Sequence, residues 1–432
     1  MSDALIDEHD AALFDLDGVV YLGPDPVPAA PDTIAELRRR GVKVGFVTNN
    51  AARSAEVVAQ HLTDIGIPTE PSDVVTSGQA ISDLAADTLP AGARVLIVGT
   101  ESLRDEARAR GLQPVESARD DPVAVIQGYD SQIAWPLLEE AGFALQAGAM
   151  WYAANPDITR PTDRGIVPGI GAQLQVVATT CNAEPVIAGK PYRPLLEATI
   201  SRLRSTSPIF VGDRLDTDVR GANTMDVDSL FVFTGSHGVA DVLAAAPEDR
   251  PQNIAADLSG LLEPKREVDV SGDRARCGGS IVSVHADREV RAESTPDDIC
   301  GQLDAVAAMM ALVYGSNVTI PDDAGRLFDK LHLTVFNWSQ RLPMWSAALS
   351  RHGKEPDVVT QWFPGHRPGS YRGICSPRRC ASRHPADVHG GGGPFCPSDG
   401  CRHAGADGAG KYPWRMCGKL IYPCRRAGTA RL

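Results

Sequence analysis

FDLDGVVYLG, at residues 14–23, decides the fold of this chain. It places Asp15 and Asp17 at the end of an apolar strand and then turns sharply at Gly18. Residues i and i+2 of a strand share a face, so both carboxylates would point from the carboxyl edge of a parallel sheet, where open α/β folds bind their ligands. Two carboxylates this close repel each other unless a cation such as Mg²⁺, with its preference for oxygen ligands, lies between them. Taken alone, the motif fits a turn Asp beside a helix-capping Asp equally well.

A second apolar run, VKVGFVTNN at residues 42–50, ends in Thr48, Asn49 and Asn50 ahead of a predicted helix. Hydroxyl, amide and free backbone N–H groups at a strand-to-helix turn form an anion-binding site. An ordinary helix cap and turn is the more frequent role of such a tripeptide. Its meaning therefore depends on the other motifs.

A third motif, VIAGKPY at residues 186–192, places Lys190 between Gly189 and Pro191. A lysine at the end of a strand is partly buried and requires an anionic partner. A phosphate group together with Asp15 would provide one.

The fourth motif is IFVGDRLDTD at residues 209–218, a β-rich run that ends in several acidic residues. Asp213 would complete the oxygen ligands of a metal ion, and Asp218 would orient its neighbours from behind the site. A solvated acidic turn is the alternative, and it suits Asp216 better than Asp213.

These four strand-end motifs, DxDG, TN, GK and GDxxxxD in this order, resemble the haloacid dehalogenase-like (HAD) phosphatases. DLDGVVYLG, VTNN, GKP and GDRLDTD are similar to the nitrophenylphosphatase-like branch, which includes phosphoglycolate and nucleotide phosphatases. The resemblance implies a doubly wound, Rossmann-like α/β core at residues 1–78 and 187–263. It also implies a large α/β cap domain at 79–186, inserted in the long interval between the second and third motifs.

The same resemblance implies a Mg²⁺-dependent phosphoric monoester hydrolase and assigns a role to each motif residue. Asp15 would be the nucleophile that forms an aspartyl-phosphate, and Asp17 the general acid and base. Mg²⁺ would be held by Asp15, the backbone carbonyl of Asp17, and Asp213. The supporting residues would be Thr48, Asn49 and Lys190 on the phosphate, with Asn50 and Asp218 behind them.

Two cap segments, GYDSQIAW (128–135) and YAANPDITRPTDRGIVPGIGA (152–172), look like the substrate-specificity segments of the family. They offer Asp130, Asn155 and Asp157 as substrate contacts, although the same residue types are common in tight turns. We expect a small polar substrate such as glycerol 3-phosphate. Phosphoglycolate, nucleotides and pyridoxal phosphate stay open, because cap contacts decide selection and spacing does not reveal them.

Composition excludes several other classes of protein. The chain has 432 residues, 43% hydrophobic residues and a net charge of −13, which suits two to three globular domains and argues against nonspecific nucleic-acid binding. MSDALIDEHD at the start lacks the features of a signal peptide, and no apolar run approaches about 18 residues. We therefore expect a cytoplasmic protein without membrane insertion, and leave homo-oligomerisation open.

Residues 269–345 predict a small α+β domain. GSIVSVHA indicates a strand, and Thr295 with Pro296 indicates the start of a helix that runs to about Leu312, with Met309 and Met310 in the core. A domain at this place is similar to the acetyltransferase-like extension of bacterial glycerol 3-phosphate phosphatases. The chain lacks a Gln/Arg-x-x-Gly-x-Gly/Ala loop for coenzyme A, so we expect a structural or regulatory role without acetyl transfer.

Residues 351–432 form a low-complexity tail. Gly and Pro make up 23 of its 82 residues, and 14 Lys/Arg against 5 Asp/Glu give it a charge of +9, a composition typical of disorder. The tail holds six of the nine cysteines, and three of its five histidines (His384, His389 and His403) lie among them, but it has no CxxC pair. A zinc site there would support the rival hypothesis, a non-catalytic metal-binding protein that acts through its tail. A shifted reading frame after Leu333 is a second interpretation.

Overall fold

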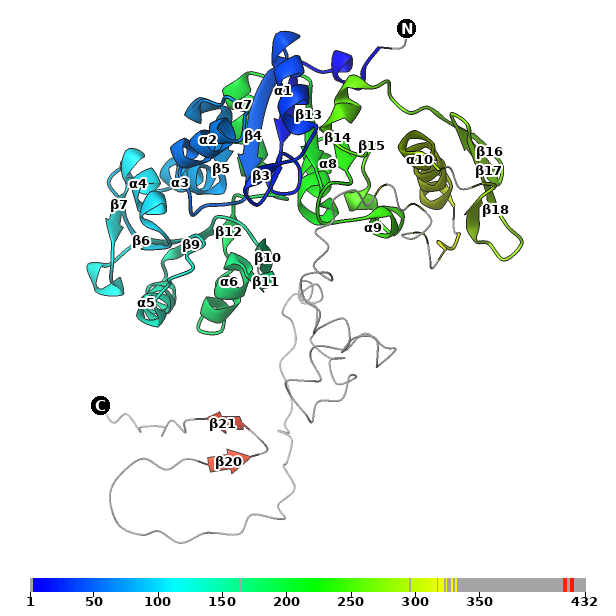
Figure 1. Cartoon of the computed structure of the whole chain (residues 1–432). Helices are drawn as coiled ribbons and strands as arrows, with labels where there is room; N and C mark the ends of the chain where they lie inside the picture. The colour runs from blue at the N-terminus through cyan, green and yellow to red at the C-terminus, as the bar shows by residue number, and fades with distance from the viewer. Residues whose placement is uncertain are drawn as a thin grey trace, which may run out of the picture. The chain divides into compact units, whose positions relative to one another are not determined.

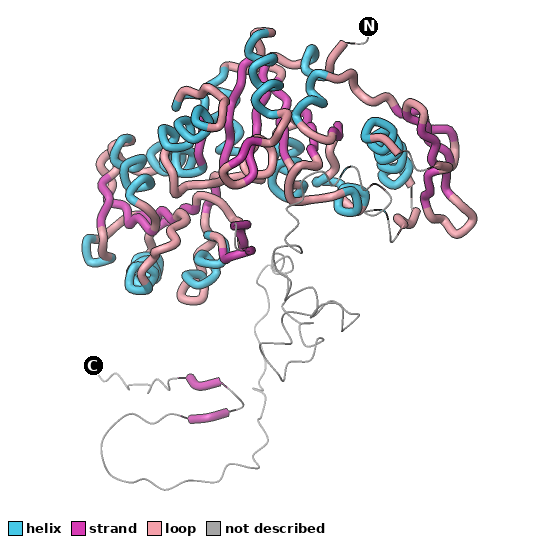
Figure 2. The backbone as a smooth tube through the Cα atoms, in the orientation of Figure 1, coloured by secondary structure: helices cyan, strands magenta, loops and turns pink. Residues whose placement is uncertain are grey.

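In the computed structural model of this chain, residues 3–321 are described apart from 163–164, 295–296 and 317. Residues 324, 328, 331, 415–417 and 420–422 are described as well. The chain divides into two units, Met1–Gly353 and Lys354–Leu432. The described part of the first unit contains three larger sheets with their helices and two two-stranded sheets (Figures 1 and 2).

The core of the first unit is a six-stranded parallel sheet in the order β15-β14-β13-β1-β4-β5. This strand order is doubly wound: β4 and β5 are added on one side of β1, and β13, β14 and β15 on the other. The direction in which strands are added therefore reverses between β1 and β13. Ligands bind outside the carboxyl ends of the strands at such a switch point. The strands are β1 (Ala11–Phe14), β4 (Lys43–Thr48), β5 (Val74–Thr76), β13 (Pro208–Gly212), β14 (Asp228–Val232) and β15 (Asn253–Ala255).

Both faces of this sheet are buried, as the continuous apolar strands predict. In β1, Ala11 and Leu13 share one hydrophobic cluster with α3 and α7, and Ala12 and Phe14 share another with α1 and α2. Helix α3 begins with a capping box in which Thr76 accepts from the backbone of Gln79 at 3.1 Å. The helices are α1 (Ala30–Arg39), α2 (Ala55–Asp64), α3 (Ser77–Thr88), α7 (Arg193–Leu203), α8 (Arg220–Thr224) and α9 (Val239–Leu243).

A second parallel sheet, in the order β12-β9-β8-β6-β7, lies between the two halves of the core sequence. Its strands and helices alternate, as the predicted α/β cap does. Strand β12 pairs with β9, so the chain returns to the core only after Ile187. The elements are β6 (Arg94–Val98), α4 (Glu101–Ala109), β7 (Gln113–Val115), β8 (Ala124–Gln127), α5 (Trp135–Gln146), β9 (Met150–Ala153), the hairpin β10 (Thr159–Thr162) and β11 (Gly165–Pro168), α6 (Ile170–Ala178) and β12 (Val186–Ile187).

The third sheet is antiparallel, with α10 (Ile299–Gly315) packed against it. The predicted helix start was wrong: α10 begins at Ile299, and Asp298 caps it by accepting from the backbone N–H of Gly301 at 2.8 Å. Residues 295–296 lie outside the described part of the chain. Met309 and Met310 are buried, as predicted, and the likeness to an acetyltransferase stays a prediction. The strands are β16 (Val268–Ser271), β17 (Arg274–Cys277), β18 (Ser280–Val284) and β19 (Val290–Ala292).

The core sheet ends in a short edge strand. After β14 the chain forms β15, which pairs with it in parallel and has three residues. Short elements complete the fold: β2 (Tyr21–Leu22), β3 (Asp25–Pro26), η1 (Leu5–Glu8), η2 (Pro71–Asp73), η3 (Ala118–Asp120), η5 (Pro247–Asp249) and η6 (Leu258–Leu262).

The second unit is described only at an antiparallel strand pair, β20 (Arg415–Cys417) with β21 (Leu420–Tyr422). The predictions of disorder and of a zinc site in the tail otherwise fall outside the described residues. Among the helices of the described residues, none has both the length and the apolar character needed to cross a membrane.

Candidate active site

A buried lysine lies at the switch point of the core sheet. The Lys190 Nζ is 2.7 Å from Asp15 Oδ1 and 2.7 Å from Asp218 Oδ1, and its side chain is 2% exposed. Burial alone would lower the pKa of Lys190, but the charges of Asp15 and Asp218 raise it well above its usual range. The ammonium therefore stays charged and joins the ends of two separate strands.

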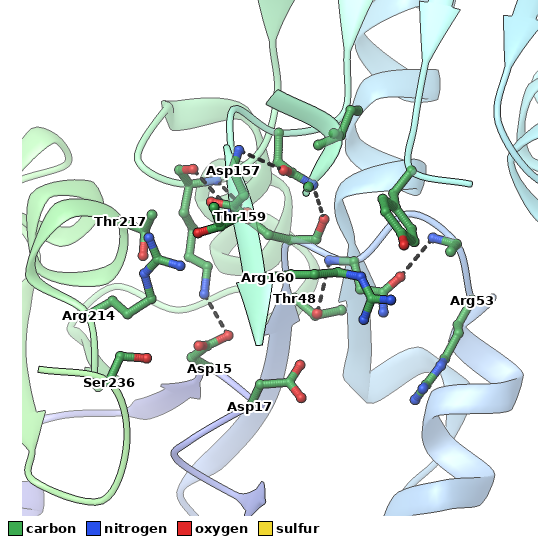
Figure 3. A pocket seen from close by; sticks show the side chains of 18 residues that line it. Asp15, Asp17, Thr48, Arg53, Asp157, Thr159, Arg160, Arg214, Thr217 and Ser236 are labelled. Carbon is green, nitrogen blue, oxygen red and sulfur yellow. Dashed lines mark hydrogen bonds and ion pairs between the residues drawn. The ribbon is translucent and has the colours of Figure 1, made fainter. Parts of the chain in front are cut away.

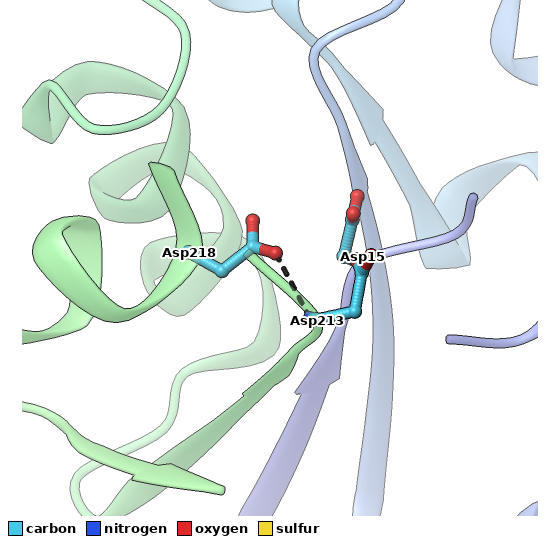
Figure 4. A group of neighbouring side chains, drawn as sticks. All are labelled: Asp15, Asp213 and Asp218. Carbon is cyan, nitrogen blue, oxygen red and sulfur yellow. Dashed lines mark hydrogen bonds between the residues drawn. The ribbon is translucent and has the colours of Figure 1, made fainter. Parts of the chain in front are cut away.

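Three carboxylates, two of them the partners of Lys190, lie close together at this edge of the sheet (Figure 4 shows the three side chains). Asp15 follows β1, Asp213 follows β13, and Asp218 lies in the helical turn η4 (Leu215–Val219). One oxygen from each lies within 4.8 Å of the other two. Asp218 Oδ2 accepts from the backbone N–H groups of Asp213 at 3.2 Å and Arg214 at 3.1 Å, which fixes its orientation. Asp15 and Asp218 thus share one ammonium, and Asp213 lies beside them without a lysine partner of its own among the described residues.

Asp213 is fully buried and only half satisfied. Its Oδ2 accepts from the backbone N–H of Ser236 at 2.6 Å, while its Oδ1 has no hydrogen-bond partner among the described residues. Burial and the negative charge of Asp218 raise the pKa of Asp213 to about 7. An unpartnered carboxylate oxygen in an acidic cluster is what a divalent cation would stabilise, so these residues fit Mg²⁺.

Glycines keep the space in front of Asp213 free. Gly18 has φ +90, and a Cβ there would lie 2.6 Å from Asp213 Oδ2. A Cβ on Gly235 would lie 1.9 Å from the same oxygen. Any side chain at either position would collide with the Asp213 carboxylate and displace it. The glycine of the DxDG motif is therefore required both by its backbone and by its closeness to the fourth motif.

Asp17 lies beside Asp15 and is exposed to the pocket. The turn that presents it is closed by a hydrogen bond from the Gly18 N–H to the Tyr21 carbonyl at 2.9 Å. Although solvent reaches Asp17, the surrounding protein removes enough water to raise its pKa, and the nearby charges of Arg53 and Lys190 oppose the increase. A raised pKa suits a group that donates a proton.

The turn after β4 holds the lysine loop and the cap in place. Asn49 Oδ1 accepts from the Lys190 N–H at 2.8 Å, and Asn49 Nδ2 donates to the Lys190 carbonyl at 3.1 Å and to Asp157 Oδ2 at 3.2 Å. Thr48 Oγ1 accepts from the Asn50 N–H at 3.1 Å, and Asn50 Oδ1 accepts from the Ala52 N–H at 2.8 Å. Thr48, Asn49 and Asn50 all line the pocket, but the amide of Asn49 is occupied by protein partners.

The core and the cap together enclose a pocket of about 310 Å³ (Figure 3). Asn155 donates to the Asn49 carbonyl, and its Oδ1 accepts from the Asp157 N–H at 3.0 Å. Burial raises the pKa of Asp157, and the charge of Arg214 opposes this increase. Of the predicted cap residues, Asn155 and Asp157 therefore reach the pocket.

Asp130 does not line the pocket. Its Oδ1 accepts from the Gln132 N–H at 2.8 Å, and its carbonyl accepts from Gln173 Nε2 at 3.1 Å. The first bond closes the loop between β8 and α5, the ordinary turn chemistry of an aspartate, and the second ties this loop to α6. The preceding residue, Tyr129, takes the pocket position instead.

Sequence reasoning missed the pocket arginines. Arg53 follows the TNN turn by three residues, and Arg160 lies inside the quoted cap segment, so both positions carried a signal. The Arg160 guanidinium lies over the Tyr129 ring, 4.7 Å from its centroid. Arg214 pairs with Asp216 at 2.9 Å. The other pocket residues absent from the prediction are Ala52, Thr159, Gly169, Ile170, Thr217 and Ser236.

Comparisons with known families identify the two halves of the core. The profile of the haloacid dehalogenase-like hydrolases matches residues 12–113. A second profile, described as HAD-hydrolase-like, matches residues 187–261. The interval between them contains most of the second sheet.

The curated relatives are phosphatases. The D-glycerol 3-phosphate phosphatase of Mycobacterium tuberculosis is 41% identical over 308 residues, which cover 71% of this chain and 86% of the relative. An acid sugar phosphatase of Staphylococcus saprophyticus is 32% identical over 229 residues, 52% of this chain and 87% of the relative.

Solved structures give the same result. The crystal structure of a glycerol phosphate phosphatase from Mycobacterium tuberculosis in complex with magnesium matches with a TM-score of 0.67 and 36% identity. The match covers 77% of this chain and 100% of that one. A 4-nitrophenylphosphatase from Thermotoga maritima matches with a TM-score of 0.56 and 25% identity over 60% of this chain and 98% of its own. The chain therefore belongs to the haloacid dehalogenase-like hydrolases, in the branch that contains the nitrophenyl phosphatases.

Proposed function

We propose that this chain is a Mg²⁺-dependent phosphomonoesterase that hydrolyses glycerol 3-phosphate through an aspartyl-phosphate on Asp15. The observation that carries the proposal is the buried cluster of Asp15, Asp213 and Asp218 around Lys190, with Asp213 Oδ1 unpartnered in the described part of the chain. Such a cluster needs further positive charge and supplies oxygen ligands for it. The phosphatases among the relatives support the class of reaction.

Asp15, the backbone carbonyl of Asp17, and Asp213 are the residues that would hold the metal. When bound there, Mg²⁺ would supply positive charge that offsets the repulsion between the Asp15 carboxylate and a phosphate dianion. Asp218 is held by two backbone N–H groups and by Lys190, so it supports the site from behind. Its role is to position Lys190 and the loop of Asp213.

In the first chemical step, an Asp15 oxygen attacks phosphorus and the bond from phosphorus to the leaving oxygen breaks. Asp17, exposed to the pocket and with a raised pKa, donates its proton to the leaving alcohol. Lys190 lies against Asp15 and is placed to stabilise negative charge on the phosphoryl oxygens. The alcohol leaves and the phosphoryl group stays on Asp15.

In the second step, a water molecule attacks the phosphorus of the aspartyl-phosphate and gives its proton to Asp17. The bond between Asp15 and phosphorus breaks, inorganic phosphate leaves, and both aspartates return to their starting protonation states. Splitting hydrolysis in this way replaces one difficult step with two easier ones. The Asp17 carboxyl group serves as the acid in the first step and as the base in the second.

Pocket size and lining favour a small polar substrate. A volume of about 310 Å³ lies at the low end of the range for small-molecule sites, roughly 300 to 1,000 Å³. Its walls carry charged and amide groups rather than a continuous apolar surface. Glycerol 3-phosphate suits this size, and the Mycobacterium tuberculosis relative supports it. Phosphoglycolate, nucleotides and pyridoxal phosphate are the alternatives.

A substrate panel tests the proposal. Phosphate release is measured with Mg²⁺ and with a chelator for glycerol 3-phosphate, phosphoglycolate, AMP and pyridoxal phosphate. We expect Mg²⁺-dependent release with the highest kcat/KM for glycerol 3-phosphate. A higher value for another ester would overturn the substrate but keep the reaction class, whereas no release from any ester by a folded protein would overturn both.

The cytoplasmic location and the self-association of the chain stay predictions.

A further inference from the structure

Two arginines line the pocket from different domains. Arg53 comes from the core loop before α2, and Arg160 comes from the cap strand β10 (Figure 3). In the part of the chain that the structure describes, neither one pairs with a carboxylate, whereas Arg214, the third pocket arginine, binds Asp216. An arginine that lines a pocket without an ion pair has its donors available for a ligand.

Tyr129 fixes the position of Arg160. The guanidinium lies 4.7 Å from the centroid of the Tyr129 ring, a cation–π contact. Contact with a ring face holds the guanidinium plane without using any of its five N–H donors. Tyr129 follows β8 and Arg160 lies on β10, so two cap segments cooperate to place this cation at the pocket. The arrangement is preorganised for hydrogen bonding to oxygen atoms.

The proposed chemistry defines what these arginines can contact. In the proposed reaction the phosphoryl group lies at Asp15. Lys190 Nζ is 2.7 Å from Asp15 Oδ1 and so lies at the same place. Asp17 gives its proton to the leaving oxygen, so the rest of the leaving group must extend past Asp17 into the pocket. In Figure 3, Arg53 and Arg160 lie on the Asp17 side, away from Arg214 and Ser236. Their donors thus lie on the side of the pocket that the leaving group would occupy.

We propose that Arg160, assisted by Arg53, binds electronegative oxygen atoms of the leaving group and is a specificity-determining residue of this enzyme. The inference rests on the proposed function and adds the class of substrate. That class is short phosphomonoesters whose carbon skeleton carries a hydroxyl or carboxylate oxygen, as distinct from esters with an apolar leaving group. Arginine can bind either kind of oxygen through two parallel N–H groups.

The test compares substrates on one enzyme. Steady-state kinetics are measured with Mg²⁺ for wild type, Arg160→Leu and Arg160→Lys on glycerol 3-phosphate, phosphoglycolate and phenyl phosphate. We expect the ratio of kcat/KM for glycerol 3-phosphate to that for phenyl phosphate to fall at least about tenfold in Arg160→Leu, mainly through KM. This is the expected scale for one hydrogen bond to a charged group. Arg160→Lys should recover part of the ratio.

Comparison of the two polar esters identifies the oxygen. A larger loss on phosphoglycolate than on glycerol 3-phosphate assigns the contact to a carboxylate, and the reverse order assigns it to a hydroxyl. Equal loss on all three esters would overturn the inference, because it would place Arg160 on the phosphoryl group or in the fold. Wild-type kcat/KM values in Arg160→Leu on all three esters would overturn it too. Wild-type inactivity on every ester is a different failure, since it would remove the proposed function itself.

A second pair of variants tests the positioning role of Tyr129. Tyr129→Phe keeps the ring over which Arg160 lies, and Tyr129→Leu removes it. We expect the leucine variant to shift substrate preference in the same direction as Arg160→Leu, but by a smaller factor, and the phenylalanine variant to retain more of the wild-type preference. Equal effects of the two variants would contradict the cation–π placement.

Discussion

Replacement of Lys190 by Met tests the electrostatics of the site. The ammonium is 2% exposed and lies 2.7 Å from a carboxylate oxygen of both Asp15 and Asp218. Removal of one partner of a buried ion pair costs about 3–5 kcal/mol, because the remaining charges stay buried. Two hydrogen bonds to charged groups, at roughly 1.5–3 kcal/mol each, sum to about 3–6 kcal/mol, an overlapping range. We expect Lys190→Met to lower the free energy of unfolding by about 3–5 kcal/mol at pH 7.

The assay is urea denaturation in a metal-free buffer, because a bound cation would replace the lost charge. Lys43→Met is the matched control. Lys43 is 42% exposed and lies 3.4 Å from Asp10, and an exposed pair of this kind contributes roughly 0–1 kcal/mol. Equal stability of the two variants at pH 7 would refute the buried ion pairs.

The pH dependence of this loss has a defined sign. Burial holds the pKa of Asp15 above its unfolded value of about 3.9, and the charge of Lys190 opposes this increase, so the pKa of Asp15 rises further when Lys190 is removed. A carboxyl group whose pKa is raised by folding destabilises the protein increasingly as pH rises from its unfolded value through its folded value. The difference between Lys190→Met and wild type should therefore shrink when pH falls from 7 to 5. A difference that grows on acidification would contradict the cause given.

Two further predictions concern Asp213. Its pKa is about 7 in the metal-free state, so it must lose a proton to bind a cation. The affinity for Mg²⁺ should therefore fall by up to about tenfold per pH unit below 7. Calorimetry that finds the same affinity at each pH would contradict this. Gly18→Ala and Gly66→Ala both force alanine into φ +90, which costs about 1–2 kcal/mol of stability. Only Gly18→Ala also brings a Cβ within 2.6 Å of Asp213, so only this variant should lose Mg²⁺ binding. Equal Mg²⁺ affinity in the two variants would refute the contact.

The core of the site was readable from sequence because it is built on strand ends. Residues after adjacent parallel strands meet at one sheet edge whatever the loops do, so Asp15 after β1 and Asp213 after β13 could be grouped from their motifs. Lys190 follows β12 of the second sheet, and it could be grouped with them because a buried ammonium requires an anionic partner. The helix cap at Asp298 and the strand β15 were missed for a local reason. A three-residue strand carries almost no periodicity, and several residues before α10 could act as its cap.

The cap contribution could not be read in the same way. Asp130 and Tyr129 are neighbours, and only the tertiary placement of their loop decides which one enters the pocket. Arg160 reaches the site because a hairpin carries it there, and the sequence gives no distance between that hairpin and Tyr129. Spacing therefore predicts chemistry at the core edge, whereas substrate contacts depend on how the two domains fit together.

Phosphate release from glycerol 3-phosphate by wild type, Asp15→Asn and Asp130→Asn, each in Mg²⁺, tests the central claim most directly. Both variants make the same change of charge, but Asp15 pairs with Lys190 while Asp130 lies outside the pocket and closes a turn. We predict release by wild type and by Asp130→Asn, and a loss of at least about a thousandfold in a folded Asp15→Asn. Wild-type rates in Asp15→Asn would contradict Asp15 as the nucleophile.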